Sequence, residues 1–355
     1  MRLNLARELI ELGYEVDVVL VKKEGSYLDT VPEGVNIVSF RILTRKYFRT
    51  FFTLFPLLRY LKKERPEALV SSLTRCNVVA ALARVVSRSG ARVAVVEHNN
   101  FSEATRSKKG IKQWFVLFFM KVLYPRVDAV IAVSKGVADD LAEVLGMERE
   151  RIAVIYNPVV TSAITERARE KTGVTWLNKG EFKTVIGIGR FSKAKNFPLL
   201  VRAFGQVARE RDDARLVLLG EGEEGSAIRT EIEKLGIEER VLLPGFVENP
   251  YAYLARADVF VLSSDWEGFG NVIVEALAVG TPVVTTDCPS GPREILADGE
   301  YGTLVPVGDE DMLAEAIRNT LDNLAGPRSE RLIERAQEFT ATRSAKEYIR
   351  TVLNE

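Results

Sequence analysis

The second half of the chain, from residue 183, alternates short apolar runs with longer segments whose apolar residues recur at helical spacing. The short runs are rich in Val, Ile and Leu, which is typical of strands buried on both faces of a parallel sheet. The longer segments have the length of crossover helices. Strands are expected in TVIGIGR, ARLVLLGEG, VLLPGF, ADVFVLSS and PVVTTD. The pattern predicts a doubly wound α/β domain.

The first half repeats this pattern less regularly, with strands expected in EVDVVLV, EALVSS, RVAVVEH, DAVIAVS and RIAVIYNP. It is predicted to be a second α/β domain, because a chain of 355 residues is longer than one hydrophobic core usually grows. Between the halves, residues 157–183 are polar, contain Asn157-Pro158 and Gly173, and lack an apolar period. This segment is predicted to be the interdomain linker.

Composition narrows the class of protein. Two cysteines, Cys76 and Cys288, exclude a disulfide framework and fit a reducing compartment. The N-terminal residues lack the apolar core and cleavage site of a secretory signal, and the run WFVLFFM at 114–120 is too short to cross a bilayer. The expectation is a cytoplasmic protein, soluble or peripheral to a membrane.

Charge is distributed unevenly between the halves. Residues 1–155 carry 25 Lys and Arg against 17 Asp and Glu, whereas the remainder carries 24 against 32. The basic half suggests an anionic partner such as a phospholipid surface, a lipid diphosphate or nucleic acid, although solvated surface charge explains it equally well. Within it, residues 41–66 and 106–126 mix aromatic residues with Lys and Arg. Interfacial helices have this composition, and so do helices packed on a sheet.

The stretch LSSDWEGFGNVIVEALAVG combines a strand end, a glycine turn and a helix start. Gly268 and Gly270 allow a close backbone approach, and the helix is expected to begin near Asn271, where unpaired N–H groups attract anions. Glu267 precedes this turn and Glu275 lies about one turn inside the helix. Phosphates need the N–H groups, and sugar or ribose hydroxyls need the carboxylates. The alternative is that both glutamates are ordinary helix and surface residues.

A second strand-to-helix loop, in GIGRFSKAKN, carries Arg190 and Lys195 before a helix whose cap is expected at Asn196. The two cations could clamp a diphosphate or could be ordinary surface charge. A third loop, LLGEGEEGS, contains Gly220 and Gly222 and is a weak signal by itself.

Together, these motifs resemble a known family. The Glu267-x7-Glu275 arrangement, GRFSKAKN, LLGEGEE, LPGFVENP and DCPSGPREIL occur in order over about residues 128–340. They resemble the retaining glycosyltransferases of family four, which have the GT-B architecture of two facing Rossmann-like domains. The resemblance implies a nucleoside-diphosphate sugar bound mainly by the C-terminal domain, an acceptor on the N-terminal domain, and reaction in the cleft.

The resemblance also implies roles for single residues. Arg190 and Lys195 would bind the diphosphate and stabilise the departing nucleotide, and Glu275 would hold the ribose hydroxyls. Glu267, with the backbone at Phe269–Gly270, would grip the transferred sugar. The other implied contacts to the sugar donor are Gly189, Gly220, Phe246, Val247, Gly268 and Asn271.

His98, in VVEHNN, is the only histidine of the chain. A lone histidine is usually a packed or hydrogen-bonded residue. The family often has a histidine in this loop, which implies that His98 orients the donor sugar and stabilises charge near the anomeric carbon. The acidic run Asp309-Glu310-Asp311 fits a helix N-cap better than a metal site. No metal and no other cofactor is expected.

The resemblance also gives domain boundaries and one departure. It implies an acceptor-binding domain of residues 1–158 plus 340–355, the latter as a helix that crosses back, and a donor-binding domain of residues 159–339. Family members open with a strand and a glycine-rich loop, whereas RLNLARELIEL begins inside the first helix. The N-terminal domain is therefore expected to lack its usual first strand.

The leading hypothesis is a metal-independent, retaining transfer of a sugar, expected from UDP, to a lipid-linked or cell-envelope glycan at the cytoplasmic face of the membrane. Nucleic acid is not an expected partner. The alternatives are a non-catalytic relative that binds nucleotide sugar and a nucleotide-sugar epimerase. A glycosidase pair of carboxylates fits less well, because it does not explain the glycine turn and the cation loop.

Overall fold

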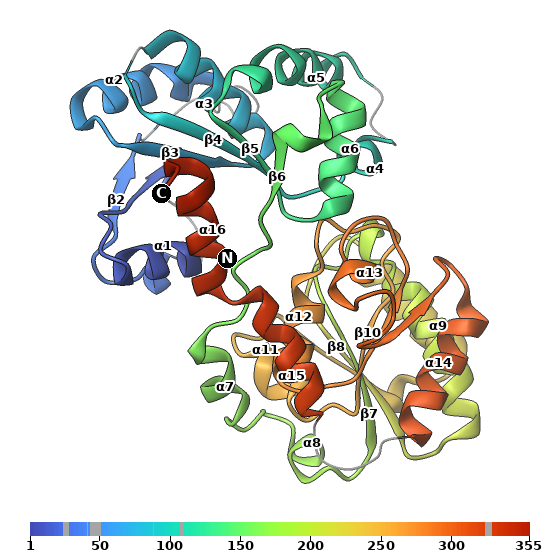
Figure 1. Cartoon of the computed structure of the whole chain (residues 1–355). Helices are drawn as coiled ribbons and strands as arrows, with labels where there is room; N and C mark the ends of the chain where they lie inside the picture. The colour runs from blue at the N-terminus through green and yellow to red at the C-terminus, as the bar shows by residue number, and fades with distance from the viewer. Residues whose placement is uncertain (24–27, 41, 43–50, 88, 107–109, 324–328) are drawn as a thin grey trace. The chain divides into compact units, whose positions relative to one another are not determined.

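The computed structural model describes the chain except residues 24–27, 41, 43–50, 88, 107–109 and 324–328 (Figure 1). The chain folds into two compact units. Unit 1 comprises Met1–Pro158 and Ala341–Glu355, and unit 2 comprises Val159–Thr340. Each unit is an α/β domain with parallel strands, as the apolar pattern predicts.

Unit 2 contains one parallel six-stranded sheet in the order β12-β11-β10-β7-β8-β9. Its strands are β7 (Lys183–Ile188), β8 (Ala214–Leu219), β9 (Val241–Gly245), β10 (Val259–Leu262), β11 (Val283–Thr286) and β12 (Thr303–Val305). The chain builds from β7 outward to β9 and then returns to the other side of β7 with β10. The direction of winding therefore reverses between β7 and β10, which in doubly wound sheets is where ligands bind.

Helices cover both faces of this sheet (Figure 1). One group consists of α9 (Phe197–Glu210), α10 (Gly225–Leu235) and α14 (Glu310–Asp322). The other consists of α7 (Ser162–Ala168), α11 (Pro250–Leu254), α12 (Asn271–Ala278) and α15 (Glu330–Ala336). Shorter elements are α8 (Thr175–Lys179), α13 (Pro292–Ile295), η5 (Lys193–Lys195), η6 (Glu238–Arg240) and η7 (Gln337–Phe339). The apolar stripe of α9, which includes the buried Leu200 and Phe204, packs against β8 and α14.

Unit 1 contains two separate parallel sheets. The smaller pairs β1 (Asp17–Leu20) with β2 (Asn36–Ser39), and the larger has the order β3-β4-β5-β6. Its strands are β3 (Ala68–Ser72), β4 (Arg92–Glu97), β5 (Ala129–Ala132) and β6 (Ile152–Val154). In the part of the chain that the structure describes, no strand joins β1 to β3. The two-sheet arrangement differs from a continuous doubly wound sheet at the position where a central strand is expected.

The helices of unit 1 are α1 (Arg2–Glu11), α2 (Leu54–Glu64), α3 (Thr74–Ser87), α4 (Phe101–Thr105), α5 (Ile111–Leu123), α6 (Lys135–Leu145) and α16 (Ala341–Leu353). Single 3-10 turns are η1 (Leu28–Thr30), η2 (Phe51–Thr53), η3 (Tyr124–Arg126) and η4 (Arg149–Arg151). Helices α2 and α5 both pack on α3. The C-terminal helix α16 packs on α1 and β4, so the end of the chain belongs to the core of unit 1.

The segment predicted as a linker, residues 157–183, is largely folded into unit 2. It contains α7 and α8, and α7 packs on α11. Arg167 donates a hydrogen bond to the carbonyl of Glu248, and the Asn249 amide donates to the carbonyl of Arg167. The chain passes from unit 1 to unit 2 at Pro158 and Val159. The polar composition of residues 157–183 therefore reflects exposed helices and not an unstructured connection.

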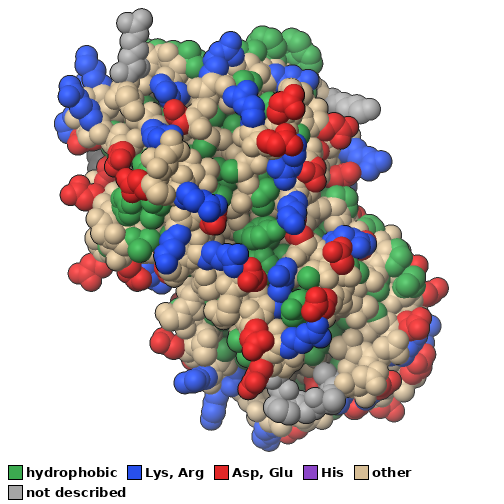
Figure 2. Space-filling view, in the orientation of Figure 1, with side chains coloured by type: hydrophobic (Ala, Val, Ile, Leu, Met, Phe, Trp, Pro, Cys, Tyr) green, Lys and Arg blue, Asp and Glu red, His purple; other side chains and the backbone are tan. Residues whose placement is uncertain are grey.

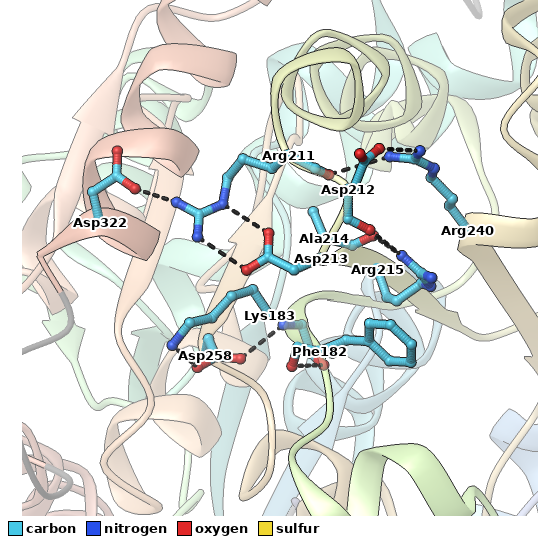
Figure 3. Close-up of polar contacts among 11 residues, drawn as sticks. Phe182, Lys183, Arg211, Asp212, Asp213, Ala214, Arg215, Arg240, Asp258 and Asp322 are labelled. Carbon is cyan, nitrogen blue, oxygen red and sulfur yellow. Dashed lines mark hydrogen bonds and ion pairs between the residues drawn. The ribbon is translucent and has the colours of Figure 1, made fainter.

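The amino-terminal edge of the unit 2 sheet is closed by ion pairs (Figure 3). Arg211 bonds both Asp213, with nitrogen–oxygen distances of 3.2 Å, and Asp322. Lys183 lies 3.5 Å from Asp258, whose other oxygen accepts the backbone N–H of Thr184. These pairs connect α9, α14 and the strand starts, so charge at this edge holds the elements together.

Candidate active site

The carboxyl-terminal edge of the same sheet brings five loops into contact. The loop after β7, residues 189–196, bonds the β8 loop through the backbone, with Phe191 N–H to the Glu221 carbonyl at 2.9 Å. The Gly220 N–H donates to the Gly245 carbonyl at the end of β9. On the other side, the Asp265 N–H after β10 donates to the Ala194 carbonyl at 2.8 Å. The Glu267 N–H donates to the Pro289 carbonyl after β11.

Glycines permit these close approaches. A Cβ on Gly220 would lie 1.9 Å from the Gly189 carbonyl oxygen, and one on Gly291 would lie 1.8 Å from that of Phe269. Both positions therefore require glycine for packing alone. At Gly189, in contrast, the nearest neighbour of an added Cβ would be Lys195 Cε at 3.5 Å, which is ordinary contact. The side-chain space at position 189 is open, and its φ of 159° is a backbone conformation that residues with side chains rarely adopt.

Lys195 and Glu267 meet at the point where the winding of the sheet reverses. Lys195 Nζ lies 2.5 Å from Glu267 Oε1, and the same oxygen accepts the hydroxyl of the buried Ser264 at 2.6 Å. The two side chains are 21% and 10% exposed. Removing either charge from a pair at this burial is costly, because the remaining charge is then left with too few polar partners. The ammonium is thus fixed at the carboxyl edge.

Side-chain contacts hold the two loops that carry this pair. The Ser263 hydroxyl donates to the Lys195 carbonyl at 3.0 Å. Asn196 occupies the N-cap position of α9, but its side chain caps no helix N–H. Instead, its amide donates to Asp265 Oδ1 at 2.8 Å. The predicted cap position is therefore confirmed, but Asn196 has a left-handed backbone with φ of 41° and its side chain bonds the β10 loop and no helix N–H.

Arg190 lies on the exposed side of the β7 loop. Its guanidinium is 3.1 Å from Glu223 of the β8 loop, and the two side chains are 75% and 53% exposed. An exposed pair of this kind is weak, since water competes for both charges. Arg190 can therefore exchange Glu223 for an anionic ligand at little cost.

Helix α12 begins at Asn271 directly after Gly270, which has φ of 97°. Glu275 lies on the first turns of this helix and has no hydrogen-bond partner among the described residues. Desolvation raises the pKa of Glu275 to about 7, and the charge of Lys195 partly opposes that increase. A carboxyl group with a raised pKa and no hydrogen-bond partner among the described residues is typical of a ligand-binding site.

The remaining predicted donor contacts have mixed surroundings. The Phe246 side chain is 65% exposed at the end of β9, beside the partly buried Val247. The Phe269 side chain is buried in edge-to-face contact with Phe339, with ring centroids 5.6 Å apart. At position 269 only the backbone faces the glycine turn, together with Gly268 and Gly270.

His98 lies in unit 1, at the end of β4, and is partly buried. Its Nε2 is 2.9 Å from Arg2 Nη2. Burial, followed by the charges of Arg2 and of the amino terminus, lowers the pKa of His98 to about 4. The imidazole is therefore neutral at pH 7.

Glu97 precedes His98 and faces the interior. Its carboxyl group accepts hydrogen bonds from Thr74 at 2.8 Å, Asn77 at 2.9 Å and Tyr124 at 2.5 Å. Burial raises the pKa of Glu97. This network connects β4, α3 and η3, and so fixes the strand end from which His98 projects.

The acidic run 309–311 has a structural role, as expected. Asp309 caps α14 by accepting the Met312 N–H at 3.0 Å. Glu310 accepts from Arg202 and Gln206, and Asp311 also accepts from Gln206. Within the described ranges, no group of His, Cys, Asp and Glu is arranged to hold a metal ion. A search of the same residues finds no helix that is long and apolar enough to cross a membrane.

Four residues that contact the predicted site residues or their partners are not predicted from the sequence. Ser264 and Glu223 bond the predicted cations or their partners, Arg2 contacts His98, and Tyr348 bonds Arg2. Glu223 is the second acidic residue of the quoted GEGEE loop, so its position was a usable signal. Arg2 and Tyr348 lie 346 residues apart, and no local pattern connects them.

Comparison with known proteins agrees with this geometry. Residues 3–163 match the family described as "Glycosyltransferase Family 4", and residues 169–339 match "Glycosyl transferases group 1". The chain is 30% identical over 352 residues to N-acetylgalactosamine-N,N'-diacetylbacillosaminyl-diphospho-undecaprenol 4-alpha-N-acetylgalactosaminyltransferase of Campylobacter jejuni. That match covers 97% of this chain and 93% of the relative. A lipopolysaccharide core biosynthesis glycosyltransferase, LpsE of Rhizobium meliloti, is 34% identical over 64% of this chain and 63% of its own length.

Solved structures share the fold. HepE of Anabaena, crystallised with UDP and glucose, superposes with a TM-score of 0.78 at 19% identity, covering 100% of this chain and 95% of its own. Sucrose-phosphate synthase of Thermosynechococcus elongatus gives 0.80 at 20% identity, over 97% and 89%. The fold of this chain is that of the GT-B glycosyltransferases. The chain belongs to glycosyltransferase family four, and it is a glycosyltransferase.

Proposed function

We propose that this enzyme transfers a sugar from a UDP-sugar to a lipid-linked or cell-envelope glycan, with retention of the anomeric configuration. One observation carries the proposal: the carboxyl edge of unit 2 combines the fixed Lys195–Glu267 pair with Glu275, which has no hydrogen-bond partner among the described residues and lies beside a glycine turn. Lys195 suits the diphosphate of a nucleotide sugar, the glycine turn suits its sugar, and Glu275 suits its ribose.

The choice of UDP is supported by structural neighbours. HepE of Anabaena has been crystallised with UDP and with UDP-glucose. In this chain, we assign the two phosphates to Lys195 and Arg190, which lie on the same loop as Gly189. Phe246 and Val247 are proposed to border the base.

The chemistry follows from charge. When the bond between the anomeric carbon and the diphosphate oxygen breaks, negative charge develops on the phosphates, and a preorganised ammonium with helix N–H groups stabilises it. The acceptor oxygen bonds to the anomeric carbon on the same face, and its proton passes to the departing phosphate oxygen. Lys195, Arg190 and the N-terminus of α12 supply this stabilisation, so we propose that transfer needs no divalent metal.

The names of relatives support a glycan acceptor. The Campylobacter relative is named for an undecaprenol-diphosphate acceptor, and the Rhizobium relative for the lipopolysaccharide core. Such acceptors are held in a membrane, and we propose that the reaction takes place at its cytoplasmic face.

Unit 1 offers a surface for that membrane. Helix α5 buries Met120 and Leu123 but exposes Trp114, Phe115 and Phe118, which are 60%, 49% and 46% exposed. The Trp114 ring stacks on Phe118 with centroids 5.8 Å apart. Hydrophobic side chains gather on the surface over α5 (Figure 2). Helix α5 thus packs with one face, and we propose that its exposed aromatic face contacts lipid.

The predicted segment 41–66 is described only in part. Residues 41 and 43–50 lie outside the described part of the chain. In the described remainder, Phe52 and Phe55 are 58% and 84% exposed, and Lys62 and Lys63 are exposed farther along α2. The two exposed phenylalanines and the exposed lysines, like the exposed Lys121 of α5, are side chains of the kinds that bind anionic headgroups.

A transfer assay tests the proposal. The purified chain is incubated with radiolabelled UDP-sugars and a polyprenyl-diphosphate-linked saccharide, with EDTA present. We expect labelled lipid product whose new linkage has the anomeric configuration of the sugar donor. Tight UDP binding with no product from any acceptor would favour a non-catalytic relative, and conversion of the UDP-sugar to its epimer would favour an epimerase.

A further inference from the structure

Three distant parts of unit 1 meet at its single histidine. Arg2 of α1 places Nη2 2.9 Å from His98 Nε2, and Nη1 donates to the hydroxyl of Tyr348 on α16 at 3.2 Å. The guanidinium also lies over the Tyr348 ring, with Cζ 5.6 Å from the centroid. Arg2 is therefore held by the C-terminal helix while it contacts the imidazole.

This contact has only one consistent hydrogen arrangement. Arginine stays protonated in proteins and has donors but no acceptor. His98 Nε2 must therefore accept, which requires a lone pair on Nε2. In a neutral imidazole the other nitrogen then carries the proton, so His98 is the Nδ1–H tautomer.

We infer that Arg2 is a positioning residue that fixes His98 as the Nδ1–H tautomer, so that His98 gives unit 1 a hydrogen-bond donor for an oxygen of a bound ligand. The inference deepens the proposed function and rests on it for the identity of the ligand. His98 Nδ1 has no hydrogen-bond partner among the described residues, so its N–H is available. With Nε2 occupied, His98 does not act as a base.

No other group near His98 supplies this orientation. The adjacent carboxyl group of Glu97 is engaged by Thr74, Asn77 and Tyr124, and accepts no bond from His98. The remaining charges are those of Arg2 and the amino terminus, and both act with burial to lower the pKa of His98. Arg2 Nε is itself buried without a partner in the described structure. The arginine is thus directed into this contact although one of its own donors stays unsatisfied.

The single histidine makes the tautomer directly measurable. In a protein labelled with 15N only at histidine, every ring signal belongs to His98. We expect Nε2 without a proton and Nδ1 protonated between pH 5 and pH 8. In Arg2→Met we expect the tautomer to shift toward the Nε2–H form that free histidine favours, and the pKa to rise by roughly one unit or more.

Controls separate orientation from general damage. Arg7→Met removes an exposed arginine from the same helix and should leave both ring signals unchanged. Arg2→Lys keeps a charged donor and should restore the Nδ1–H form. If Arg2→Met fails to fold, two other spectra decide which tautomer His98 adopts and whether Arg2 fixes it. They are the spectrum of the wild type and that of Tyr348→Phe, which removes the hydroxyl that holds Arg2. An Nε2–H signal in the wild type would overturn the inference.

The outcome is independent of the transfer assay. An Nδ1–H tautomer in a protein that transfers no sugar would leave the orientation established and reject the proposed function. Transfer with retention by a protein whose His98 carries its proton on Nε2 would do the reverse. If the inference holds, transfer by the wild type should show no loss of rate near pH 6.5, where a titrating histidine would produce one. His98→Gln should then slow transfer at every pH.

Discussion

The two edges of the unit 2 sheet carry similar residues and use them differently. At the amino edge, Arg211 is shared by Asp213 and Asp322, and Lys183 pairs with Asp258 (Figure 3). At the carboxyl edge, Lys195 has a buried partner, Arg190 has an exposed one, and Glu275 has none among the described residues. The named charges at the amino edge are all paired, whereas at the carboxyl edge Arg190 and Glu275 can still bind a ligand.

This difference separates structural charge from binding charge. A charge that connects two elements and is fully paired stabilises the fold and gains little from a ligand. A carboxyl group whose pKa is raised by burial carries a desolvation cost that a ligand hydroxyl can offset. Charge density alone does not distinguish the two edges, because both contain Lys, Arg, Asp or Glu. The state of pairing does.

The largest expected difference is in stability. Glu267→Ala leaves the Lys195 ammonium and the Ser264 hydroxyl without their partner, so the free energy of unfolding should fall by about 1.5–3 kcal/mol. Asp213→Ala at the amino edge removes a pair that is 23% and 49% exposed, and should cost only about 0.2–1 kcal/mol. Urea denaturation of both variants at pH 7 measures the difference. Equal losses would remove the distinction between a buried and an exposed pair.

The next prediction concerns pH. The pKa of Glu275 is about 7, and hydroxyl donors bind the ionised form, so affinity for a UDP-sugar should rise with pH. Between pH 6 and pH 8 the ionised fraction increases about ten-fold, and the association constant should follow it. A UDP-sugar is used in place of UDP because its phosphates do not titrate in this range.

Glu275→Gln serves as the control for that pH series. Its amide cannot ionise, so its affinity should be lower at pH 8 and nearly constant from pH 6 to pH 8. The same pH dependence in wild type and variant would assign the titration to another group and contradict the role of Glu275.

A smaller effect is expected at the exposed pair. Glu223→Gln releases Arg190 without removing it, so affinity for a UDP-sugar should increase about two- to three-fold. Arg190→Ala should decrease affinity by a similar factor. Calorimetric titration at low salt measures both changes. Weaker binding by Glu223→Gln would mean that Glu223 itself contacts the ligand.

A surface prediction concerns unit 1 alone. Replacing Trp114 and Phe118 of α5 by Ser should reduce sedimentation with anionic vesicles several-fold while UDP binding stays unchanged, because the aromatic rings supply the apolar contact. The matched control is Phe246→Ser in unit 2, which removes an equally exposed aromatic residue. Loss of sedimentation in the control alone would contradict the assignment of α5.

Most strands were predictable because buried parallel strands are continuous apolar runs. The exceptions are β2 and β12, three or four residues long at sheet edges, whose partly exposed residues leave no such run. The linker was predicted from polarity, from Asn157-Pro158 and Gly173, and from the missing apolar period, whereas α7 and α8 are polar because they lie on the surface. Local composition cannot show that a polar helix packs on a domain.

The site was predictable where it depends on loops that follow strands. Lys195, Glu267 and Glu275 each stand just beyond or inside such a loop, and doubly wound topology brings these loops together. The pairing of Lys195 with Glu267 was not predicted, since 72 residues separate them. Nor was the Arg2 contact to His98, because it depends on the packing of α1 and α16 around β4.

Calorimetric titration of one UDP-sugar into Lys195→Ala and Lys183→Ala, side by side and without metal, tests the account most directly. The two variants remove the same side chain from opposite edges of one sheet. Binding should weaken roughly 10- to 150-fold for Lys195→Ala and stay unchanged for Lys183→Ala. Equal affinities in the two variants, or a loss confined to Lys183→Ala, would contradict the placement of the nucleotide-sugar site at the carboxyl edge of unit 2.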